Sequence, residues 1–325
     1  GRPRATALLA VAGLDGERGA ILARKVLCDR ALEVRVAATE ILAGIPGERG
    51  LAAAEIALKD ESWSVRLTAI RALAVRAEAA SIPPLIGALR REDGRLREEA
   101  GEALAAVTGV GLPPDPRRWA SWWAKAKGEF KVPEKPAAPP KARDESVVTF
   151  HSIPVVSRTM AFVLDRSRSM NQRIARDEER RKGEMVESEL RATLERMGRS
   201  SRFLLVAFRT EPEVFHPRPV PIAARRKAAD WYASLEPSGR TNLYDAVAIA
   251  LAEPSIDTIF LLTDGAPSAG EYRNRGAILT AVARANRYRK AVIHTVDIGG
   301  GTTGKRWKGF LAELSRSTGG RHVKR

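Results

Sequence analysis

Residues 160–169, MAFVLDRSRS, decide the architecture of the second half of this 325-residue chain. The first five residues are all apolar, which is typical of a strand buried on both faces of a sheet. Polar residues follow at once. Asp165, Ser167 and Ser169 alternate along the sequence, so an extended turn points all three side chains the same way. The segment therefore predicts a buried strand with oxygen-bearing side chains at its carboxyl end.

The rest of residues 147–325 alternates strand-like and helical patterns. The other apolar runs are 203–208, 256–262 and 291–298. The amphipathic stretches are 184–197, 222–235, 242–252, 274–289 and 305–316. Near-continuous apolar strands alternating with helices predict a doubly wound, Rossmann-like α/β fold with a mostly parallel central sheet and helices on both faces. Ligands bind at the carboxyl ends of the strands in such sheets.

Two further segments bring oxygen donors to the same predicted edge of the sheet. Thr263-Asp264-Gly265 follows the third apolar run, and residues 239–245, GRTNLYD, lead into the helix at 242. We therefore expect two carboxylates and three hydroxyls to converge there. Mg²⁺ prefers such an all-oxygen set with few carboxylates. A two-carboxylate hydrolase pair and a loop that holds no metal remain alternatives, but the neighbouring hydroxyls favour a coordination shell over acid–base catalysis.

These residues resemble, position by position, the metal-ion-dependent adhesion site (MIDAS) of von Willebrand factor type A domains, and the resemblance covers residues 159–325. It implies a site for Mg²⁺ or Mn²⁺ formed by Asp165, Ser167, Ser169, Thr241 and Asp264. The two serines and the threonine are then the inner ligands, and the two aspartates act mostly through water. The resemblance also implies one coordination position left for a Glu or Asp carboxylate of a partner protein.

Two arginines distinguish the loop of this chain. Arg168 stands where the family usually has a small residue, often glycine, and Arg166 precedes it. Guanidinium groups beside the metal would fork onto an acidic ligand and strengthen its capture. They would equally compete with the cation for Asp165 and weaken metal binding. The sequence leaves both interpretations open.

The first 110 residues contain an internal repeat. Its arginines stand 31 residues apart, at Val34-Arg35, Val65-Arg66 and Leu96-Arg97. The positions that stay in phase are Ala38, Ala69 and Ala100, then Leu42, Leu73 and Leu104, with Asp29, Asp60 and Asp93 before each unit. This pattern resembles short HEAT-type repeats, which predicts an all-α solenoid of stacked helix pairs. We expect the arginines to pair with acidic residues of a neighbouring unit; an irregular Ala-rich bundle and a ligand-binding arginine ladder are the alternatives.

The composition between the two halves changes twice. Residues 111–128 carry Trp119, Trp122 and Trp123 at helical spacing, which predicts a helix that caps the solenoid rather than a stacking platform for bases or sugars. Residues 129–146 are rich in Pro, Lys and Ala and predict a semi-rigid linker. The predicted domains are therefore 1–110 (repeats), 111–128 (capping helix), 129–146 (linker) and 147–325 (the type A domain).

Charge and composition limit the classes of function. The formal net charge is +16, of which residues 147–325 carry +12 and residues 1–128 only +4. One cysteine, Cys28, excludes an intramolecular disulfide and a Cys-based zinc site, and no two of the four histidines have helical ligand spacing. No apolar run approaches the roughly 18–20 residues of a membrane helix. The chain does not begin with Met, so a removed signal peptide and export stay open, and the compartment is undetermined.

Catalytic motifs are incomplete. Residues 299–305, GGGTTGK, imitate a phosphate-binding loop, but Arg306 stands where that motif needs Ser or Thr. No G-x-S-x-G nucleophile motif occurs. We therefore expect a protein that is not an enzyme.

The leading hypothesis is a metal-dependent protein-binding module carried on a HEAT-type stalk, whose positive domain steers acidic surfaces toward the site. One alternative is RNA binding, because HEAT-type repeats and a type A domain also occur together in Ro ribonucleoproteins. That family uses a basic ring of repeats, whereas the repeats here are few and only weakly basic. A second alternative is an accessory subunit of an AAA ATPase of the chelatase or chaperone kind.

Overall fold

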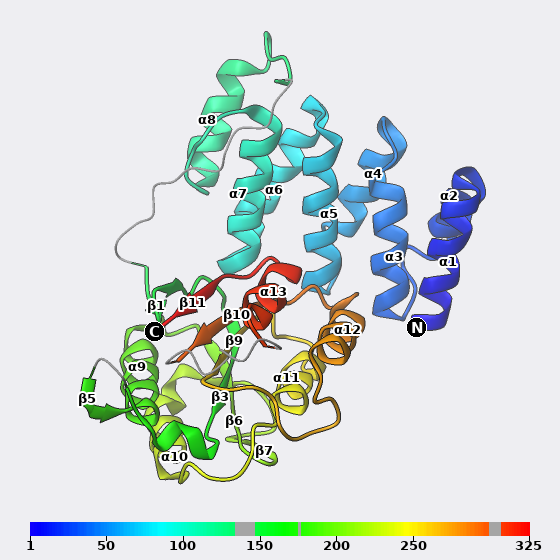
Figure 1. Cartoon of the computed structure of the whole chain (residues 1–325). Coiled ribbons are helices and arrows are strands. Elements are labelled where there is room, and N and C mark those ends of the chain that lie inside the picture. Colours follow the sequence, from blue (N-terminus) through cyan, green and yellow to red (C-terminus); the bar gives the residue numbers. More distant parts are fainter. Residues whose placement is uncertain (134–146, 175–176, 299–306) are drawn as a thin grey trace. The chain divides into compact units, whose positions relative to one another are not determined.

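The computed structural model describes residues 1–133, 147–174, 177–298 and 307–325, and it divides into two compact units, Gly1–Asp144 and Glu145–Arg325. Most of the predicted linker (134–146) and the glycine-rich loop at 299–305 lie outside the described residues. The first unit is helical and the second alternates strands and helices (Figure 1). Both predicted fold classes are confirmed.

Unit 1 is a stack of helix pairs. Its helices are α1 (Arg2–Leu14), α2 (Gly16–Lys25), α3 (Leu32–Ala43), α4 (Glu48–Ala57), α5 (Trp63–Arg76), α6 (Ile82–Arg91), α7 (Gly94–Thr108) and α8 (Pro116–Ala126). Helices α1, α3, α5 and α7 pack on one another in order, and α2, α4 and α6 lie against them (Figure 1). The in-phase alanines of the repeat are fully buried at these contacts, at Ala38, Ala69 and Ala100. Small side chains at these positions let neighbouring helices approach closely and form one continuous core.

Ion pairs join successive repeats. Arg35 Nε donates to Asp60 Oδ2 at 2.7 Å, so the predicted pairing with the acidic residue of the next unit is present. Arg66 instead pairs with Glu92, the neighbour of the residue that the repeat pattern singled out, with Nε 2.8 Å from Oε1. Arg97, in the last repeat, donates from Nε to the Glu92 carbonyl at 2.8 Å. These arginines are therefore structural.

Helix α8 packs against α6, and its tryptophans form an aromatic cluster. Trp119 is fully buried and meets Trp122 edge-on at 5.7 Å between ring centroids. Phe130 lies against both half-buried tryptophans, 5.8 Å from Trp122 and 5.6 Å from Trp123. Aromatic side chains packed in this way stabilise the end of the helical stack.

Unit 2 is built on one sheet with the strand order β11-β10-β9-β3-β6-β7, and β8 also pairs with β6. Its strands are β3 (Thr159–Asp165), β6 (Arg202–Phe208), β7 (Pro212–Val214), β8 (Val220–Pro221), β9 (Thr258–Thr263), β10 (Val292–Asp297) and β11 (His322–Lys324). All pairs from β11 to β6 are parallel, whereas β7 and β8 run antiparallel to β6. The sheet is therefore mostly parallel, and β3 lies at its centre.

Helices cover both faces of this sheet (Figure 1). The helices are α9 (Lys182–Arg196), α10 (Arg225–Ser234), α11 (Leu243–Ala252), α12 (Arg275–Asn286) and α13 (Phe310–Ser317). Alternate residues of β3, such as Phe162 and Leu164, share a core cluster with Leu190 of α9 and Tyr232 of α10. Helix α11 packs against β3, β6 and β9, and α12 packs against α11 and α13. The predicted helices at 222–235 and 305–316 begin later than expected, at Arg225 and Phe310.

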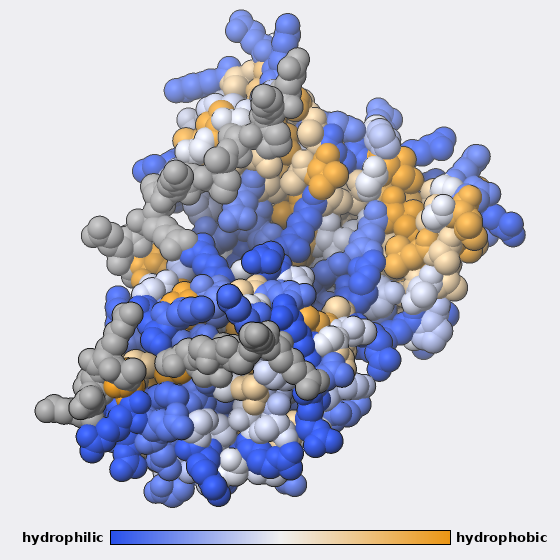
Figure 2. Space-filling view, in the orientation of Figure 1, coloured by the Kyte–Doolittle hydropathy of each residue, from blue (hydrophilic) through white to orange (hydrophobic). Residues whose placement is uncertain are grey.

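Short elements complete unit 2. They are the hairpin β1 (Thr149–Phe150) with β2 (Ile153–Pro154), and the pair β4 (Arg173–Ile174) with β5 (Asp177–Arg181). On the face shown in Figure 2, hydrophilic residues cover most of unit 2, whereas apolar residues gather over the N-terminal helices of unit 1. None of the helices in the described parts of the chain is long and apolar enough to cross a membrane.

Candidate functional site

Strand β3 ends on Asp165, whose carboxylate is completely buried and fully hydrogen-bonded. Its Oδ1 accepts from the Ser167 backbone N–H at 2.7 Å, and its Oδ2 accepts from the Thr263 hydroxyl at 2.5 Å. Thr263 is the last residue of the neighbouring strand β9. The two central strands therefore deliver their polar ends to one point at the carboxyl edge of the sheet.

The loop after β3 brings the two serines to the second carboxylate. After Ser167 the chain makes one 3₁₀ turn, Arg168–Asn171. The Ser167 and Ser169 hydroxyl oxygens are 3.2 Å apart, and Ser169 Oγ donates to Asp264 Oδ1 at 2.6 Å. The fold thus brings together four of the five residues that the sequence singled out.

Thr241, the fifth residue, lies on the adjoining loop. That loop is tied to the β3 loop by backbone bonds from Ser238 N–H to the Arg166 carbonyl at 2.9 Å and from Arg168 N–H to the Gly239 carbonyl at 3.4 Å. Thr241 is buried, and its backbone N–H donates to Ser268 Oγ at 3.0 Å. Within the described residues its hydroxyl makes no hydrogen bond.

The spacing of these oxygens suits a small divalent cation. Adjacent ligands of an octahedral Mg²⁺ at 2.0–2.1 Å lie about 2.9 Å apart. The two oxygen–oxygen distances through Ser169, 3.2 Å to Ser167 and 2.6 Å to Asp264, lie on either side of that value. The set has only two carboxylates, and nowhere in the described ranges do three or more His, Cys, Asp or Glu form a group that could hold a metal. Any metal here would depend on the hydroxyl oxygens.

Burial makes the first carboxylate expensive to ionise. Desolvation raises the pKa of Asp165 to about 6, the hydrogen bonds from Ser167 and Thr263 act against this increase, and the charge of Asp264 adds to it. A buried carboxylate next to a second one is stabilised by a nearby positive charge. The electrostatics of the edge therefore favour a cation.

Lys182, which the sequence reasoning missed, supplies a positive charge within this site. Its Nζ lies 2.6 Å from Asp264 Oδ2 and 3.1 Å from Gln172 Oε1, and both side chains of the ion pair are buried, at 8% and 1% exposure. Lys182 is the first residue of α9. A basic residue at the start of a helix opposes the helix dipole and needs a compensating partner, but no pattern in the sequence identifies that partner.

Arg166 does not face the open edge of the site. Its Nη1 pairs with Glu187 Oε1 at 2.6 Å, its Nη2 donates to the Ala233 carbonyl at 3.1 Å, and its guanidinium lies 4.7 Å from the ring centroid of Tyr232. Tyr232 in turn donates its hydroxyl to the Asp165 carbonyl at 3.0 Å. Arg166 therefore anchors the loop to α9 and α10, and its guanidinium is not bonded to either carboxylate oxygen of Asp165. Neither sequence-based interpretation of this arginine is observed.

Arg168 is the exposed arginine of the loop, and its side chain has no hydrogen-bond or ion-pair partner in the described part of the chain. Arg240 is also exposed and donates to the Ser268 carbonyl. Both lie next to the candidate site: Arg168 is in the β3 loop, which is bonded to the loop that carries Thr241, and Arg240 directly precedes Thr241. The surface next to the site is consequently positive.

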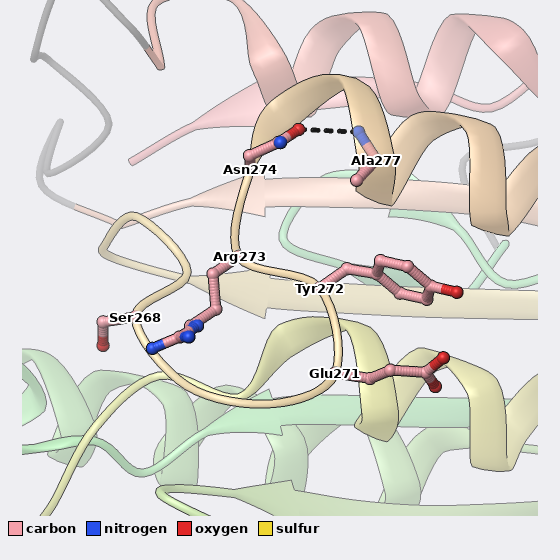
Figure 3. A pocket seen from close by; sticks show the side chains of 6 residues that line it. All are labelled: Ser268, Glu271, Tyr272, Arg273, Asn274 and Ala277. Atoms are coloured by element: carbon pink, nitrogen blue, oxygen red, sulfur yellow. Dashed lines mark hydrogen bonds between the residues drawn. The ribbon is translucent and has the colours of Figure 1, made fainter.

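A cavity of about 520 Å³ adjoins this surface (Figure 3). It is lined by Ser268, Glu271, Tyr272, Arg273, Asn274 and Ala277. Ser268 links it to Thr241, and Asn274 Oδ1 accepts from the Ala277 N–H at 2.8 Å to cap α12. In Figure 3 the Arg273 side chain extends toward Ser268, whereas Glu271 and Tyr272 point away. The cavity therefore adds a third exposed arginine beside the candidate site.

Comparisons with known proteins agree with this architecture. The von Willebrand factor type A domain model matches residues 159–323, and a HEAT-repeat model matches residues 51–115. Inter-alpha-trypsin inhibitor heavy chain H4 of Homo sapiens is 31% identical over 132 residues, a match that covers 36% of this chain but only 13% of that relative.

Matching solved structures include a von Willebrand factor type A protein from Catenulispora acidiphila, at 16% identity, with 52% of this chain and 38% of that chain covered and a TM-score of 0.42. BatB from Bacteroides thetaiotaomicron matches at 15% identity, with 52% and 90% covered and a TM-score of 0.39.

Proposed function

Because the chain belongs to the von Willebrand factor type A domain family, we propose that it is a non-enzymatic protein-binding module that uses Mg²⁺ or Mn²⁺ to capture an acidic residue of a partner protein. Membership of this family is consistent with a protein-interaction role. The observation that carries the metal dependence is the chain of oxygens from Ser167 through Ser169 to Asp264 at the end of β3. Asp165, Ser167, Ser169, Thr241 and Asp264 are the proposed metal residues.

Each part of the site has a role in this proposal. Ser167, Ser169 and Thr241 present neutral oxygens that bind the cation directly, and the two aspartates supply charge. A bound divalent cation acts as a Lewis acid with an open position for a carboxylate of the partner. Tyr232 and Arg166 hold the loop that carries the serines, so the donors are positioned before any ligand arrives.

The arginines around the site select the charge of the partner. Arg168, Arg240 and Arg273 are exposed beside it, and unit 2 as a whole carries most of the net positive charge. A positive rim speeds encounter with acidic surfaces and disfavours basic ones. The partner that fits this surface is a protein with a Glu or Asp surrounded by further acidic residues.

The helical unit contributes a scaffold in this proposal. Arg35 and Arg66 are engaged in ion pairs between repeats, so they do not form a free ladder for phosphate groups. These ion pairs therefore give no support to RNA binding by the repeats. No described contact favours a role beside an AAA ATPase.

Metal titration tests the proposal. Mn²⁺ added to EDTA-treated, dialysed protein should bind at one site, measured by loss of the free Mn²⁺ signal in electron paramagnetic resonance. Ser169→Ala should weaken that binding at least tenfold because it removes one of the bridging oxygens. Ser255→Ala removes a hydroxyl that bonds Glu253 instead and should leave binding unchanged. Equal binding by both variants would assign the metal to another place and overturn the proposed site.

The partner is tested by co-purification with and without EDTA. A protein with an acidic surface should be retained with Mg²⁺ and released by EDTA. Retention that is insensitive to EDTA and to Ser169→Ala would contradict metal-dependent capture.

A further inference from the structure

The buried ammonium of Lys182 already supplies a positive charge to Asp264, one of the two carboxylates of the candidate metal site. It is bonded to Asp264 Oδ2, while the other oxygen of the same carboxylate accepts from Ser169. Both oxygens of Asp264 are therefore engaged within the protein. A divalent cation that binds Ser169 would stand next to a carboxylate whose charge is already neutralised.

The position of Lys182 is unfavourable apart from this interaction. A buried ammonium loses its hydration, which is costly unless it is paired. Lys182 also begins α9, where the positive end of the helix dipole repels a cation. The ion pair with Asp264 and the bond to Gln172 Oε1 compensate both effects. The ammonium is thus held in place by the same carboxylate that is expected to attract a metal.

Resting on the proposed function, we propose that Lys182 is a tethered cation that competes with the divalent metal for Asp264 and lowers the metal affinity of the site. Metal binding then loosens the Lys182–Asp264 pair. Gln172, 3.1 Å from Nζ, remains as an acceptor for the displaced ammonium. The flexible four-carbon side chain of lysine permits this shift, and its point charge gives no directional bond that fixes it to Asp264.

This competition predicts a rise in metal affinity when the charge of Lys182 is removed. Lys182→Met keeps the length of the side chain and removes the ammonium, so it should tighten Mn²⁺ binding ten- to a hundredfold. Lys182→Arg keeps the charge and should not tighten binding. Lys227→Met is the matched control, because Lys227 is exposed on α10 and its loss changes the net charge by the same amount.

A second measurement separates competition from a purely structural role. Without metal, Lys182→Met leaves the buried carboxylate of Asp264 unpaired and should lower the thermal unfolding temperature. Mn²⁺ should then raise the unfolding temperature of Lys182→Met by more than it raises that of the wild type, because a tighter ligand stabilises the folded state more. A structural lysine would lower the unfolding temperature with no gain in metal affinity.

The outcomes distinguish this inference from the proposed function. If the wild type binds Mn²⁺ and Lys182→Met binds it no more tightly, the competition is wrong and the metal site stands. If only Lys182→Met binds, the competition is supported and metal-dependent capture by the native protein is overturned. If neither binds at millimolar Mn²⁺, both are overturned.

Discussion

The ion pair between the first two arginine-bearing repeats of unit 1 should make a large contribution to the stability of the solenoid. Arg35 donates to both Asp60 oxygens, at 2.7 and 3.1 Å, and to Glu61 at 3.1 Å. It also donates to the backbone carbonyls of Asp29 and Arg30. The Arg35 side chain is 9% exposed, and that of Asp60 is 11% exposed. Replacing Arg35 with Ala therefore leaves the nearly buried Asp60 carboxylate without its cation.

Removing one partner of a buried ion pair costs about 3–5 kcal/mol, whereas removing a single ordinary hydrogen bond costs about 1 kcal/mol. Arg97 occupies the same repeat position, and the one side-chain hydrogen bond that it makes among the described residues goes to the Glu92 carbonyl. We expect Arg35→Ala to lose about 3 kcal/mol more unfolding free energy than Arg97→Ala. Arg35→Lys should fall between them, because lysine keeps the charge but loses the bidentate geometry.

Urea denaturation followed by far-ultraviolet circular dichroism measures these differences, because helices α1–α8 of unit 1 contain most of the helical residues that the structure describes. Equal losses for Arg35→Ala and Arg97→Ala would refute the reasoning, since the pairing with Asp60 would then contribute nothing beyond its repeat position. A wild-type value for Arg35→Lys would show that charge alone, and not the bidentate contact, joins the repeats.

Further outcomes follow from unit 2 and from the glycines. Burial, and secondly the charge of Arg325, lowers the pKa of His151 to about 4 from 6.5; the unfolded chain then binds the proton more readily. The contribution of neutral His151 to the free energy of unfolding is therefore full above pH 6.5 and is lost as the pH falls toward 4. At pH 5 the loss is about 2 kcal/mol. Urea unfolding followed by near-ultraviolet circular dichroism should show this loss in the wild type but not in His151→Gln; the same loss in both would assign it elsewhere. Gly320→Ala places a Cβ within 2.0 Å of the Ile293 carbonyl oxygen and should lower the thermal unfolding temperature by several degrees. Gly13→Ala, in helix α1 with no atom within 4 Å of the added Cβ, should stabilise unit 1 by about 0.5–1 kcal/mol in urea denaturation, and a loss would contradict this.

Structural elements that follow from a local or repeating sequence pattern could be predicted. Side-chain positions that depend on contacts between distant parts of the chain could not. The unbroken apolar run before Asp165 indicated a buried central strand, and β3 is that strand. The in-phase residues Ala69 and Leu73 indicated stacked helices, because a recurring spacing reflects a recurring contact. The direction of Arg166 depended on Glu187, which is 21 residues away, and on Tyr232, which is 66 residues away. Local pattern carries no information about such partners.

The missed lysine shows the same limit at the candidate site. Asp264 and Lys182 are 82 residues apart and belong to different elements, so no spacing joins them. A composition rule would even have placed an acidic residue at the start of α9. Only the folded structure shows that Lys182, at the start of α9, pairs with Asp264, which follows the end of β9.

Charge balance then links the tethered lysine to the acidic partner. Within the site, the two aspartates and Lys182 together leave one negative charge, because Arg166 is balanced by Glu187. A divalent cation changes that balance to one positive charge in a buried place, which burial disfavours. A single carboxylate from the partner restores neutrality. On the proposed function, metal and acidic ligand should therefore bind cooperatively, and each should bind weakly in the absence of the other. Reciprocity of the two affinities is a thermodynamic requirement of such coupling. Lys182 thus makes metal binding depend on the partner: the site binds its metal weakly alone and more tightly once the partner's carboxylate is present.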